Sequence, residues 1–455
     1  MSTSSLAAAQ TELVSFDGGY RLTSALACPD RYRLLTSTSL VGPRISRGAG
    51  LSYCAASFGT GVLSLDHRQF NRVLGFDAEK AVVHVEAGIS LGELFDFLAP
   101  RGFLLRTQPG HPSITVGGCI AADAHGKNQY RDGNFSSQVE ALTLFHPRHG
   151  TVGLSRDLNP DWFALTCGGY GLTGSILSAS LRVVAMPGQS TRLNMTPLAG
   201  LAELCRQFES AATTSDIVYS WHDLSLSAKP FGHGVLVQGV FVPEEVEASR
   251  DTPKTPTGDS VRGLLRSERR GRGYPRLLNA ATVSMLNSLL FTFRYSRSTQ
   301  FVGLYESLFP VAGNASRYFD LFGRAGFHEY QALLPPNRFE SFAREMEQQV
   351  RKRGVPVSLA SAKFFRGHQS QLRFDGSGIC FAVNVPRTTE ARQFMESMDG
   401  IVLGHGGIPN IIKDSRLPAG VVQRAFAEFD RFRDELLRFD PERLYRSELS
   451  ERLGL

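Results

Sequence analysis

Apolar and polar positions along the first 185 residues alternate in short blocks that are separated by glycine-rich turns. Residues 81–86 are mainly apolar and predict a strand. Ser90 and Glu93 are spaced as a capping box, so a helix should begin directly after Ser90. Pro100 and Gly102 should end this helix. The apolar positions that fall on one of its faces are Leu91, Leu94, Phe95 and Leu98.

The following blocks predict further elements of both kinds. Residues 139–145 and 151–154 flank turn-forming residues at 147–150 and predict a hairpin. Residues 160–165 are typical of the start of a helix, and residues 176–184 are typical of a strand. This mixture predicts an α+β domain in the first part of the chain.

The pattern changes to longer strands and helices from about Pro187, where residues 235–241 form the clearest strand. Residues 244–276 have little apolar content and many basic side chains, which predicts a mobile basic loop or lid. A mainly apolar stretch follows at 281–293, and a helical tail is expected over 418–455. A basic loop beside an apolar stretch can touch a membrane surface or a lipid phosphate. The more frequent alternative is a solvated surface loop over a buried helix.

Three glycine-rich segments lie at residues 47–53, 109–128 and 168–174. Small side chains leave backbone N–H groups uncovered, so a flat anionic ligand can approach the main chain closely. Each segment taken alone is more often a tight turn. The three together predict a site for a ligand that carries a diphosphate and a ring.

Two other nucleotide sites fit the sequence less well. Gly169, Gly171 and Gly174 match the spacing of the dinucleotide fingerprint, but a helix pattern precedes them, a strand pattern follows, and Asn194 stands where an acid is needed. The segment at 125–128 is not a phosphate-binding loop of nucleoside triphosphatases, because no Gly-Lys-Ser/Thr follows a spaced glycine.

Composition places the chain among globular proteins of two or three domains. It has 455 residues, 42% hydrophobic and 20% charged, and a net charge of +6 from 49 basic and 43 acidic side chains. No basic patch interleaved with aromatic residues predicts a nucleic-acid groove. The cysteines lack Cys-x-x-Cys spacing and a His at ligand spacing, so neither a metal site nor a disulfide framework is expected. They are Cys28, Cys54, Cys119, Cys167, Cys205 and Cys380.

The glycine-rich segments resemble the FAD-binding half of the vanillyl-alcohol-oxidase type of flavoproteins. Within that group, Thr-Val-Gly-Gly at 115–118, His-Gly-Lys-Asn at 125–128 and Lys-Asp-Ser-Arg at 413–416 look most like the decaprenylphosphoryl-ribose 2-oxidases. The resemblance implies a two-part FAD-binding domain of the PCMH type, formed by residues 1–187 and 408–455. Residues 188–407 would form an inserted substrate domain built on an antiparallel sheet.

The resemblance also implies which residues lie along FAD. Many members of this group bind FAD covalently through a His in the Arg-Gly-x-Gly-x-Ser turn, where this chain has Leu51, so non-covalent FAD is expected. The cofactor-binding residues implied are Arg47, Gly48, Gly50, Leu51, Ser52, Tyr53, Gly110, Thr115, Gly117, Gly118, Ala122, His125, Gly126, Asn128, Gly171, Thr173 and Ile176.

A second set of residues would act on the substrate. A secondary hydroxyl that loses a hydride must be polarised or deprotonated, and Lys413 is the residue expected to do so. The catalytic set implied is Lys413, Tyr53, His125 and Gln331, and the substrate-binding set is Lys127, Gln331, Lys363 and Lys413.

One departure from the family concerns its active-site cysteine. Alignment on Pro386 puts Ala382 at that position, with Cys380 two residues away on the same strand face. Which of the two residues faces the flavin depends on a strand register that the sequence does not fix.

The expected activity is FAD-dependent oxidation of a secondary sugar hydroxyl to a keto-sugar, on a polyprenyl-phosphate pentose, as the first half of an epimerisation. A short-chain dehydrogenase/reductase would be the partner. The alternatives are an aldonolactone or alditol oxidase acting on a free sugar, and a sugar-lipid binding protein without turnover. No signal peptide is predicted, so a cytoplasmic protein with peripheral contact at the inner membrane is expected.

Overall fold

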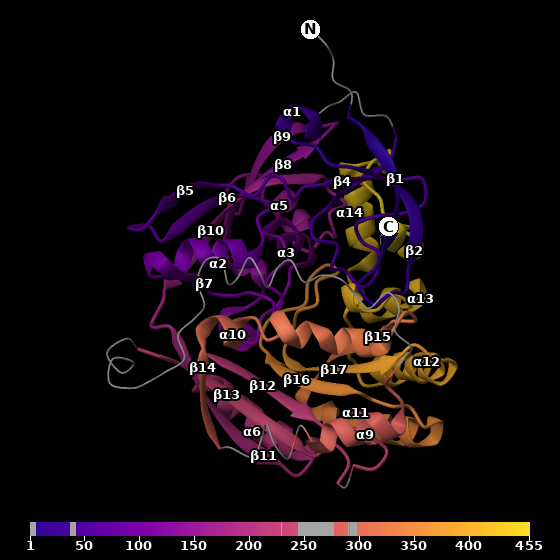
Figure 1. The fold of residues 1–455 in the computed structure, drawn as a ribbon. Coiled ribbons are helices and arrows are strands. Elements are labelled where there is room, and N and C mark those ends of the chain that lie inside the picture. The colour runs from indigo at the N-terminus through magenta and orange to yellow at the C-terminus, as the bar shows by residue number, and fades with distance from the viewer. Residues whose placement is uncertain (1–5, 37–41, 229, 244–276, 290, 292–297) are drawn as a thin grey trace.

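The computed structural model describes residues 6–36, 42–228, 230–243, 277–289, 291 and 298–455. The predicted basic loop at 244–276 lies outside these residues. The described chain is α+β, with three β-sheets and helices between and around them (Figure 1). This confirms the predicted fold class, while the predicted domain boundaries stay a prediction. No helix within the described ranges is long and apolar enough to cross a bilayer.

Two sheets are built from the first 185 residues. The smaller sheet has the order β1-β2-β4-β3, and its strands are β1 (Ala8–Val14), β2 (Arg21–Ala27), β3 (Arg44–Arg47) and β4 (Leu63–Asp66). The larger sheet has the order β5-β6-β10-β8-β9, with β7 also paired to β10. Its strands are β5 (Val73–Asp77), β6 (Val82–Glu86), β7 (Phe103–Leu105), β8 (Val139–His146), β9 (Gly150–Ser155) and β10 (Ser175–Ala185). The predicted hairpin at 139–154 is thus confirmed as β8 and β9.

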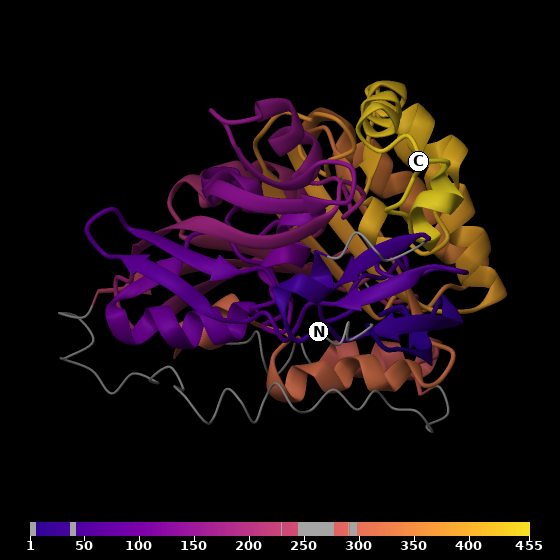
Figure 2. The ribbon, with the colours of Figure 1, turned by 90° about the horizontal axis from the view of Figure 1, so that it is seen from above.

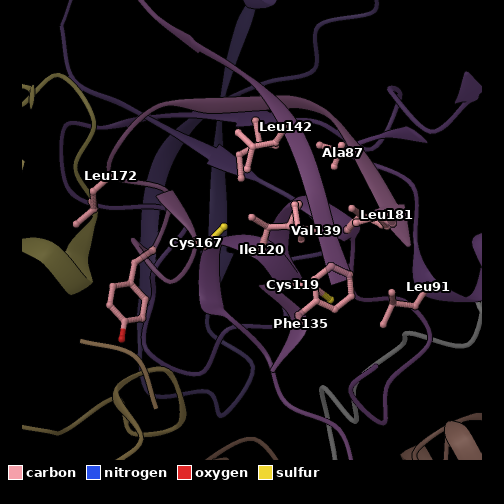
Figure 3. Close-up of a cluster of buried hydrophobic side chains, with 14 of the residues drawn as sticks. Ala87, Leu91, Cys119, Ile120, Phe135, Val139, Leu142, Cys167, Leu172 and Leu181 are labelled. Carbon is pink, nitrogen blue, oxygen red and sulfur yellow. The ribbon is translucent and has the colours of Figure 1, made fainter. Parts of the chain in front are cut away.

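The predicted capping box begins helix α2 (Leu91–Leu98). Ser90 Oγ accepts from the N–H of Glu93, and the Glu93 carboxylate accepts from the N–H of Ser90. Helix α3 (Val116–Ala122) lies beside it and is capped by Thr115. Both helices send their apolar side chains into one core, and Figure 3 shows Leu91, Cys119 and Ile120 packed with residues of the larger sheet.

The third sheet has eight strands, and all of its pairings are antiparallel. Its order is β14-β11-β13-β12-β16-β17-β15-β18. The strands are β11 (Ser190–Leu198), β12 (Ile217–His222), β13 (Gly234–Val242), β14 (Thr299–Gly303), β15 (Phe327–Leu334), β16 (Leu359–Phe365), β17 (Gly378–Pro386) and β18 (Ile408–Pro409).

Three helices cover one face of this sheet. They are α6 (Leu201–Thr213), α11 (Pro336–Arg353) and α12 (Thr389–Gly404). Phe208, Phe342 and Phe394 bring their rings from these helices into a core with the sheet residues Ala332 and Phe381. Because successive side chains of a strand point to opposite faces, the residues on either side of Ala332 and Phe381 point away from this core.

The end of the chain packs against its beginning. The predicted helical tail is confirmed as α13 (Ala419–Ala425), α14 (Phe429–Phe439) and α15 (Glu448–Leu453). Phe432 and Leu449 belong to the same buried cluster as Ile45 and Val85. Figures 1 and 2 show these C-terminal helices beside the N-terminal strands, along one side of the molecule. The segment before α13 therefore runs between the eight-stranded sheet and the first part of the chain.

The remaining helices and 3-10 turns connect these layers. They are α1 (Tyr32–Leu35), α4 (Gln129–Asp132), α5 (Pro160–Thr166), α9 (Ala280–Leu289), α10 (Leu304–Leu308), η1 (Ala99–Arg101), η2 (Phe135–Gln138), η4 (Gly313–Phe322) and η5 (Ile411–Lys413).

The turn after β6 is clamped by backbone on several sides. Ala87 donates its N–H to Leu177 O, and Gly117 donates its N–H to Ala87 O at 2.7 Å. Gly88 donates to Phe70 O, and a Cβ atom at Gly88 would lie 1.9 Å from His67 O. A side chain at position 88 would therefore force two backbone segments apart.

Gly88→Ala should lower the free energy of unfolding by about 3 kcal/mol, because the added methyl group meets backbone that cannot rotate away. Urea denaturation followed by circular dichroism measures the change. Gly400→Ala is the matched control, since no heavy atom lies within 4 Å of a Cβ in this helical position. It should raise stability by about 0.5–1 kcal/mol. Equal effects of the two substitutions would contradict the claim that neighbouring backbone leaves no room for a side chain at position 88.

Candidate functional site

A cavity that is partly open to solvent lies between the small β-sheet, helix α3 and the start of β10. The predicted cofactor-binding residues that line it are Arg47, Gly48, Gly50, Leu51, Ser52, Thr115, Gly117, Gly118, Ala122, Gly171 and Ile176. Further lining residues are Ala56, Ser57, His67, Ala87, Ile114, Ala121, Ala124, Tyr170, Gly174 and Ile412.

The turn that follows β3 offers unpaired backbone donors to this cavity. Within the described part of the chain, the N–H groups of residues 48–52 donate to no other protein group. Gly50 has a φ of +70°, a left-handed conformation that favours glycine. Gly48 passes so close to Thr115 that a Cβ atom would lie 2.2 Å from its Oγ1. This turn is therefore a concave row of donors suited to a diphosphate.

His67 also borders the cavity, although no sequence motif marks it. Its ring is buried, and its Nε2 has no hydrogen-bond partner among the described residues. Burial lowers the pKa of His67 to about 4, so the ring is neutral at pH 7. A buried, neutral and unpaired ring nitrogen next to a cavity calls for a polar ligand atom.

The cavity therefore fits FAD on two counts. Its turn at 48–52 presents donors for a diphosphate, and its small side chains leave room for flat rings. Leu51 borders the cavity at the position where a covalent link would require His.

A second group of polar side chains lies where the cavity meets the eight-stranded sheet. Residues directly opposite each other in neighbouring strands share a face, and here Glu329 pairs with Asn384, Gln331 with Ala382, and Lys363 with Cys380. All of them occupy the face that the covering helices leave open. Tyr330, between Glu329 and Gln331, points into the opposite core.

Lys413 completes this group from the short turn η5. Its Nζ lies 3.4 Å from Glu329 Oε1 and 4.1 Å from the centre of the Tyr53 ring. The preceding residue, Ile412, lines the cavity and accepts a hydrogen bond from the N–H of Tyr53. The cation is therefore held beside the end of the cavity by a carboxylate and an aromatic face.

Gln331 is held in the same place by Asn410. The Asn410 side chain donates to Gln331 Oε1 at 2.5 Å, and its backbone N–H donates to Gln331 O at 2.8 Å. Asn410 also caps η5 by accepting from the N–H of Ile412. One residue thus fixes both Gln331 and the turn that presents Lys413.

The electrostatics of the group follow from burial and from its lysines. Burial, and then the charge of Lys363, lower the pKa of His125 well below its usual range. Burial and the nearby charge of Lys413 lower the pKa of Lys363, and burial raises the pKa of Cys380 to about 12. At neutral pH the imidazole is therefore uncharged and the thiol keeps its proton.

The structure also settles the register around Cys380. Cys380 and Ala382 lie on the same face of β17, opposite Lys363 and Gln331 respectively. Cys380 is buried in a small cluster with Phe365 and Phe374, whose rings also contact His125. Its protonated, buried thiol is a poor nucleophile.

Several residues of the predicted set lie elsewhere. Lys127 Nζ donates to Ser307 O at 2.8 Å and lies over the Tyr219 ring, so it faces the β11–β13 side of the sheet. Thr173 donates to Thr166, and neither Gly110 nor Gly126 lines the cavity. The roles predicted for these residues stay predictions.

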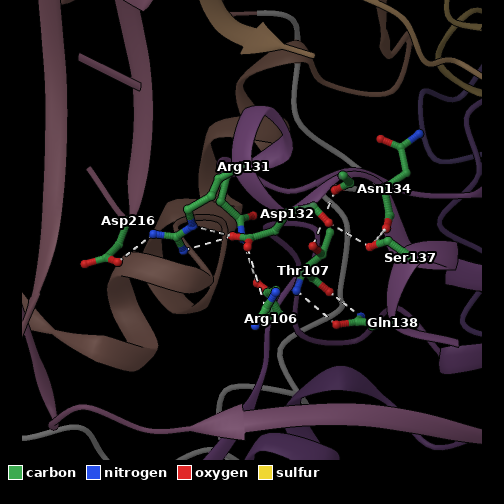
Figure 4. Close-up of polar contacts among 10 residues, drawn as sticks. Arg106, Thr107, Arg131, Asp132, Asn134, Ser137, Gln138 and Asp216 are labelled. Carbon is green, nitrogen blue, oxygen red and sulfur yellow. Dashed lines mark hydrogen bonds and ion pairs between the residues drawn. The ribbon is translucent and has the colours of Figure 1, made fainter. Parts of the chain in front are cut away.

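Asn128 holds the loop that carries His125. Its amide donates to Arg106 O and to Asp132, each at 2.7 Å. Figure 4 shows how this loop is secured, with Arg131 bridging Asp132 and Asp216, and Gln138 bonded to the backbone of Thr107 on both its amide atoms. The ion pair of Arg131 with Asp216 ties the loop to the eight-stranded sheet.

Sequence reasoning missed three residues of this site, namely Glu329, Asn410 and His67. The two-residue period of β15 was a usable signal for Glu329, because it puts Glu329 on the face of Gln331. Asn410 and His67 carry no motif, and their roles depend on contacts with distant segments. No group of three or more His, Cys, Asp or Glu in the described ranges could hold a metal ion.

Part of this chain matches a known domain family, and nearly all of it is similar to a known oxidase. Residues 42–153 match the family model described as the FAD binding domain. Decaprenylphosphoryl-beta-D-ribose oxidase of Mycolicibacterium smegmatis is 27% identical over 436 residues, which cover 93% of this chain and 92% of that protein.

Two plant enzymes are also similar. L-gulonolactone oxidase 3 of Arabidopsis thaliana is 22% identical over 458 residues, covering 88% of this chain and 75% of that protein. L-galactono-1,4-lactone dehydrogenase 1, mitochondrial, of Oryza sativa subsp. japonica is 38% identical over 114 residues, covering 25% of this chain and 19% of that protein.

The cavity and these similarities confirm the prediction of FAD as the cofactor and of an oxidoreductase as the class of protein. The chain is an FAD-dependent oxidoreductase, and its residues 42–153 match an FAD binding domain.

Proposed function

We propose that this protein oxidises a secondary hydroxyl of a sugar to a keto-sugar, and that the sugar is a pentose carried on a polyprenyl phosphate. The observation that carries this proposal is the position of Lys413, whose Nζ is held beside Glu329 and Tyr53 at the end of the cofactor cavity. A positioned acid–base group beside a redox cofactor is what oxidation of a carbinol requires.

When bound, FAD supplies the acceptor for the two electrons and the hydrogen of the carbinol C–H bond. The residues of this chain have the complementary tasks. Lys413 polarises the hydroxyl and handles its proton, Gln331 holds a neighbouring sugar hydroxyl, and the neutral ring of His125 lies near both lysines. Lys363 presents positive charge to an anionic group of the substrate or of the flavin ring.

Two features support a lipid-linked sugar over a free one. The similarity to the decaprenylphosphoryl-ribose oxidase runs along 93% of this chain, including the eight-stranded sheet. The lysines of the substrate side suit a phosphate. The second candidate, oxidation of a free aldonolactone or alditol, is supported by the similarity to the L-gulonolactone oxidase over 88% of this chain.

The keto-sugar product would be the substrate of a partner enzyme. A keto-sugar is completed to an epimer by a reductase that adds hydrogen to the opposite face, and a short-chain dehydrogenase/reductase performs this class of reaction. Peripheral contact with a membrane would bring the protein to a lipid-linked substrate. Leu277, Met285 and Leu289, which follow the basic segment 244–276 in the sequence, expose apolar side chains and support such a contact.

Substrate choice can be tested by anaerobic stopped-flow reduction of the flavin. A short-chain prenylphosphoryl-ribose should bleach the flavin in a single turnover, whereas L-galactono-1,4-lactone and D-arabinono-1,4-lactone should not. Faster reduction by either lactone would replace the proposed function with the second candidate.

A variant lacking residues 244–276 extends this test to the lipid. We expect a higher KM for a long-chain lipid-linked ribose and an unchanged kcat for the short-chain analogue, because the basic side chains pair with phosphate and an anionic surface. Equal loss on both substrates would instead make the segment part of the flavin site.

Acid precipitation should release FAD into the supernatant, because Leu51 cannot form a histidyl bond to the flavin. The flavin absorbance of the pellet and of the supernatant measures how much FAD is released. Yellow colour that stays in the pellet would show a covalent link through another residue.

Lys413→Ala should leave FAD bound but slow flavin reduction by the sugar about 100-fold or more, since a positioned acid–base group contributes on this scale. The measurement is single-turnover bleaching after FAD content has been matched to that of the unaltered protein. Lys80→Ala removes an exposed lysine that pairs with Asp77, and should change neither value. A reduction rate close to that of the unaltered protein would remove Lys413 from the mechanism.

A further inference from the structure

Glu329 is a buried carboxylate that is paired with Lys413, the lysine on which the proposed function depends. It lies on β15 with 8% of its surface exposed, and its Oε1 is 3.4 Å from Lys413 Nζ. The sequence carries no motif that assigns it a role. A buried charge is retained where it is paired, and this pairing also holds the Lys413 side chain over the Tyr53 ring.

Among its titratable neighbours in the described structure, Glu329 is the only carboxylate. The titratable side chains that face it in the described structure are Lys413, Lys363, Tyr53, Tyr318 and Cys380. Burial, with the nearby carboxylate, raises the pKa of the Tyr53 phenol well above its usual value, and burial raises that of the Cys380 thiol.

These neighbours narrow the choice of proton acceptor. The phenols and the thiol are protonated at neutral pH and cannot accept a proton. The buried ring of His125 resists a positive charge because its pKa is lowered, and Lys413 is paired as a cation with the carboxylate. Glu329 is therefore the carboxylate to which this site can deliver a proton without adding net positive charge.

We propose that Glu329 is the final acceptor of the substrate hydroxyl proton, which reaches it through Lys413. This inference rests on the proposed function. Lys413 Nζ takes the hydroxyl proton as it gives one of its own to Glu329 Oε1, so the amine ends the step as it began. The C–H and O–H bonds of the carbinol break and its C=O bond forms; the C–H hydrogen and two electrons go to FAD.

The proton affinity of a paired carboxylate is sufficient for this step. As the C–H bond breaks, the remaining O–H group takes on the character of a protonated ketone, which is a far stronger acid than a carboxylic acid. The two lysines stabilise the carboxylate beforehand, and the neutral acid formed afterwards leaves both cations in place. The side chain of Lys413 is 28% exposed, so the proton can pass from Glu329 to solvent along the same pair.

The test compares Glu329→Gln with Glu329→Asp in the FAD-loaded protein. Gln keeps the size of the side chain and an oxygen that faces Lys413 but removes the proton acceptor, so single-turnover flavin reduction by a short-chain prenylphosphoryl-ribose should slow about 100-fold or more. Asp keeps the carboxylate and should restore part of this loss.

The protonated product state gives a direct spectroscopic readout. The infrared difference spectrum between substrate-reduced and oxidised protein should contain a carboxylic-acid carbonyl band that shifts in D₂O and is missing in Glu329→Gln. Glu345→Gln, which removes a carboxylate paired with His405 on the helix-covered face of the sheet, is the control and should retain both rate and band. A near-normal rate for Glu329→Gln, or a band that persists in it, overturns the proposal.

Substrate-free labelling separates this inference from the proposed function. If no sugar in the panel reduces the flavin, the proposed function fails, and the rate at which acetic anhydride acylates Lys413, followed by mass spectrometry, still tests the pair. Glu329→Gln should accelerate acylation of Lys413 several-fold and leave that of the exposed Lys80 unchanged. An unchanged rate at Lys413 would show that Glu329 does not control the lysine, and the proposal would fall.

Discussion

The close contact between the turn at Ala87–Gly88 and the start of helix α3 is the constraint on which the cofactor cavity depends. Gly117 donates its N–H to Ala87 O, and Gly88 lies against the backbone of His67. These contacts bring together three segments that line the cavity from different parts of the sequence. A larger residue at either glycine would separate the segments, and the cavity would lose its walls before any ligand contact was altered.

The alternation of side chains along the strands of the eight-stranded sheet positions the polar residues of the site. Its two-residue period sends Tyr330 and Phe381 into the core under the helices and leaves Glu329, Gln331 and Lys363 on the opposite face. Packing on one face therefore fixes the positions of polar groups on the other. A slip of one residue in β15 would bury Glu329 among aromatic side chains and remove the partner of Lys413.

The local parts of this structure could be read from the sequence, because their causes are local. The capping box at Ser90 and the hairpin after Val139 depend on residues within a few positions of each other. The cofactor turn at 47–53 could be recognised by its small residues.

The site residues that could not be predicted from the sequence owe their positions to pairing between strands that are far apart in the chain. Asn410 meets Gln331 only because β18 pairs with β15, and His67 faces the cavity only because its segment follows a parallel strand. Lys127 illustrates the converse. Its motif predicts a substrate contact, which stays a prediction, and in the structure its Nζ donates to Ser307 O and lies over the Tyr219 ring. A motif fixes the backbone position of a lysine far better than the direction of its four-carbon side chain.

The cofactor cavity and the polar group around Lys413 differ in charge. The cofactor cavity presents mostly backbone donors and neutral side chains, whereas its far end holds two lysines and one carboxylate. Burial and repulsion from Lys413 lower the pKa of Lys363, which means that its positive charge is not fully compensated by the protein. An anionic group beside Lys363 would restore that balance at little desolvation cost, because the cation is already desolvated. A phosphate-bearing substrate or the electron-rich edge of a flavin ring can provide this group, whereas a neutral lactone has no charge to offer.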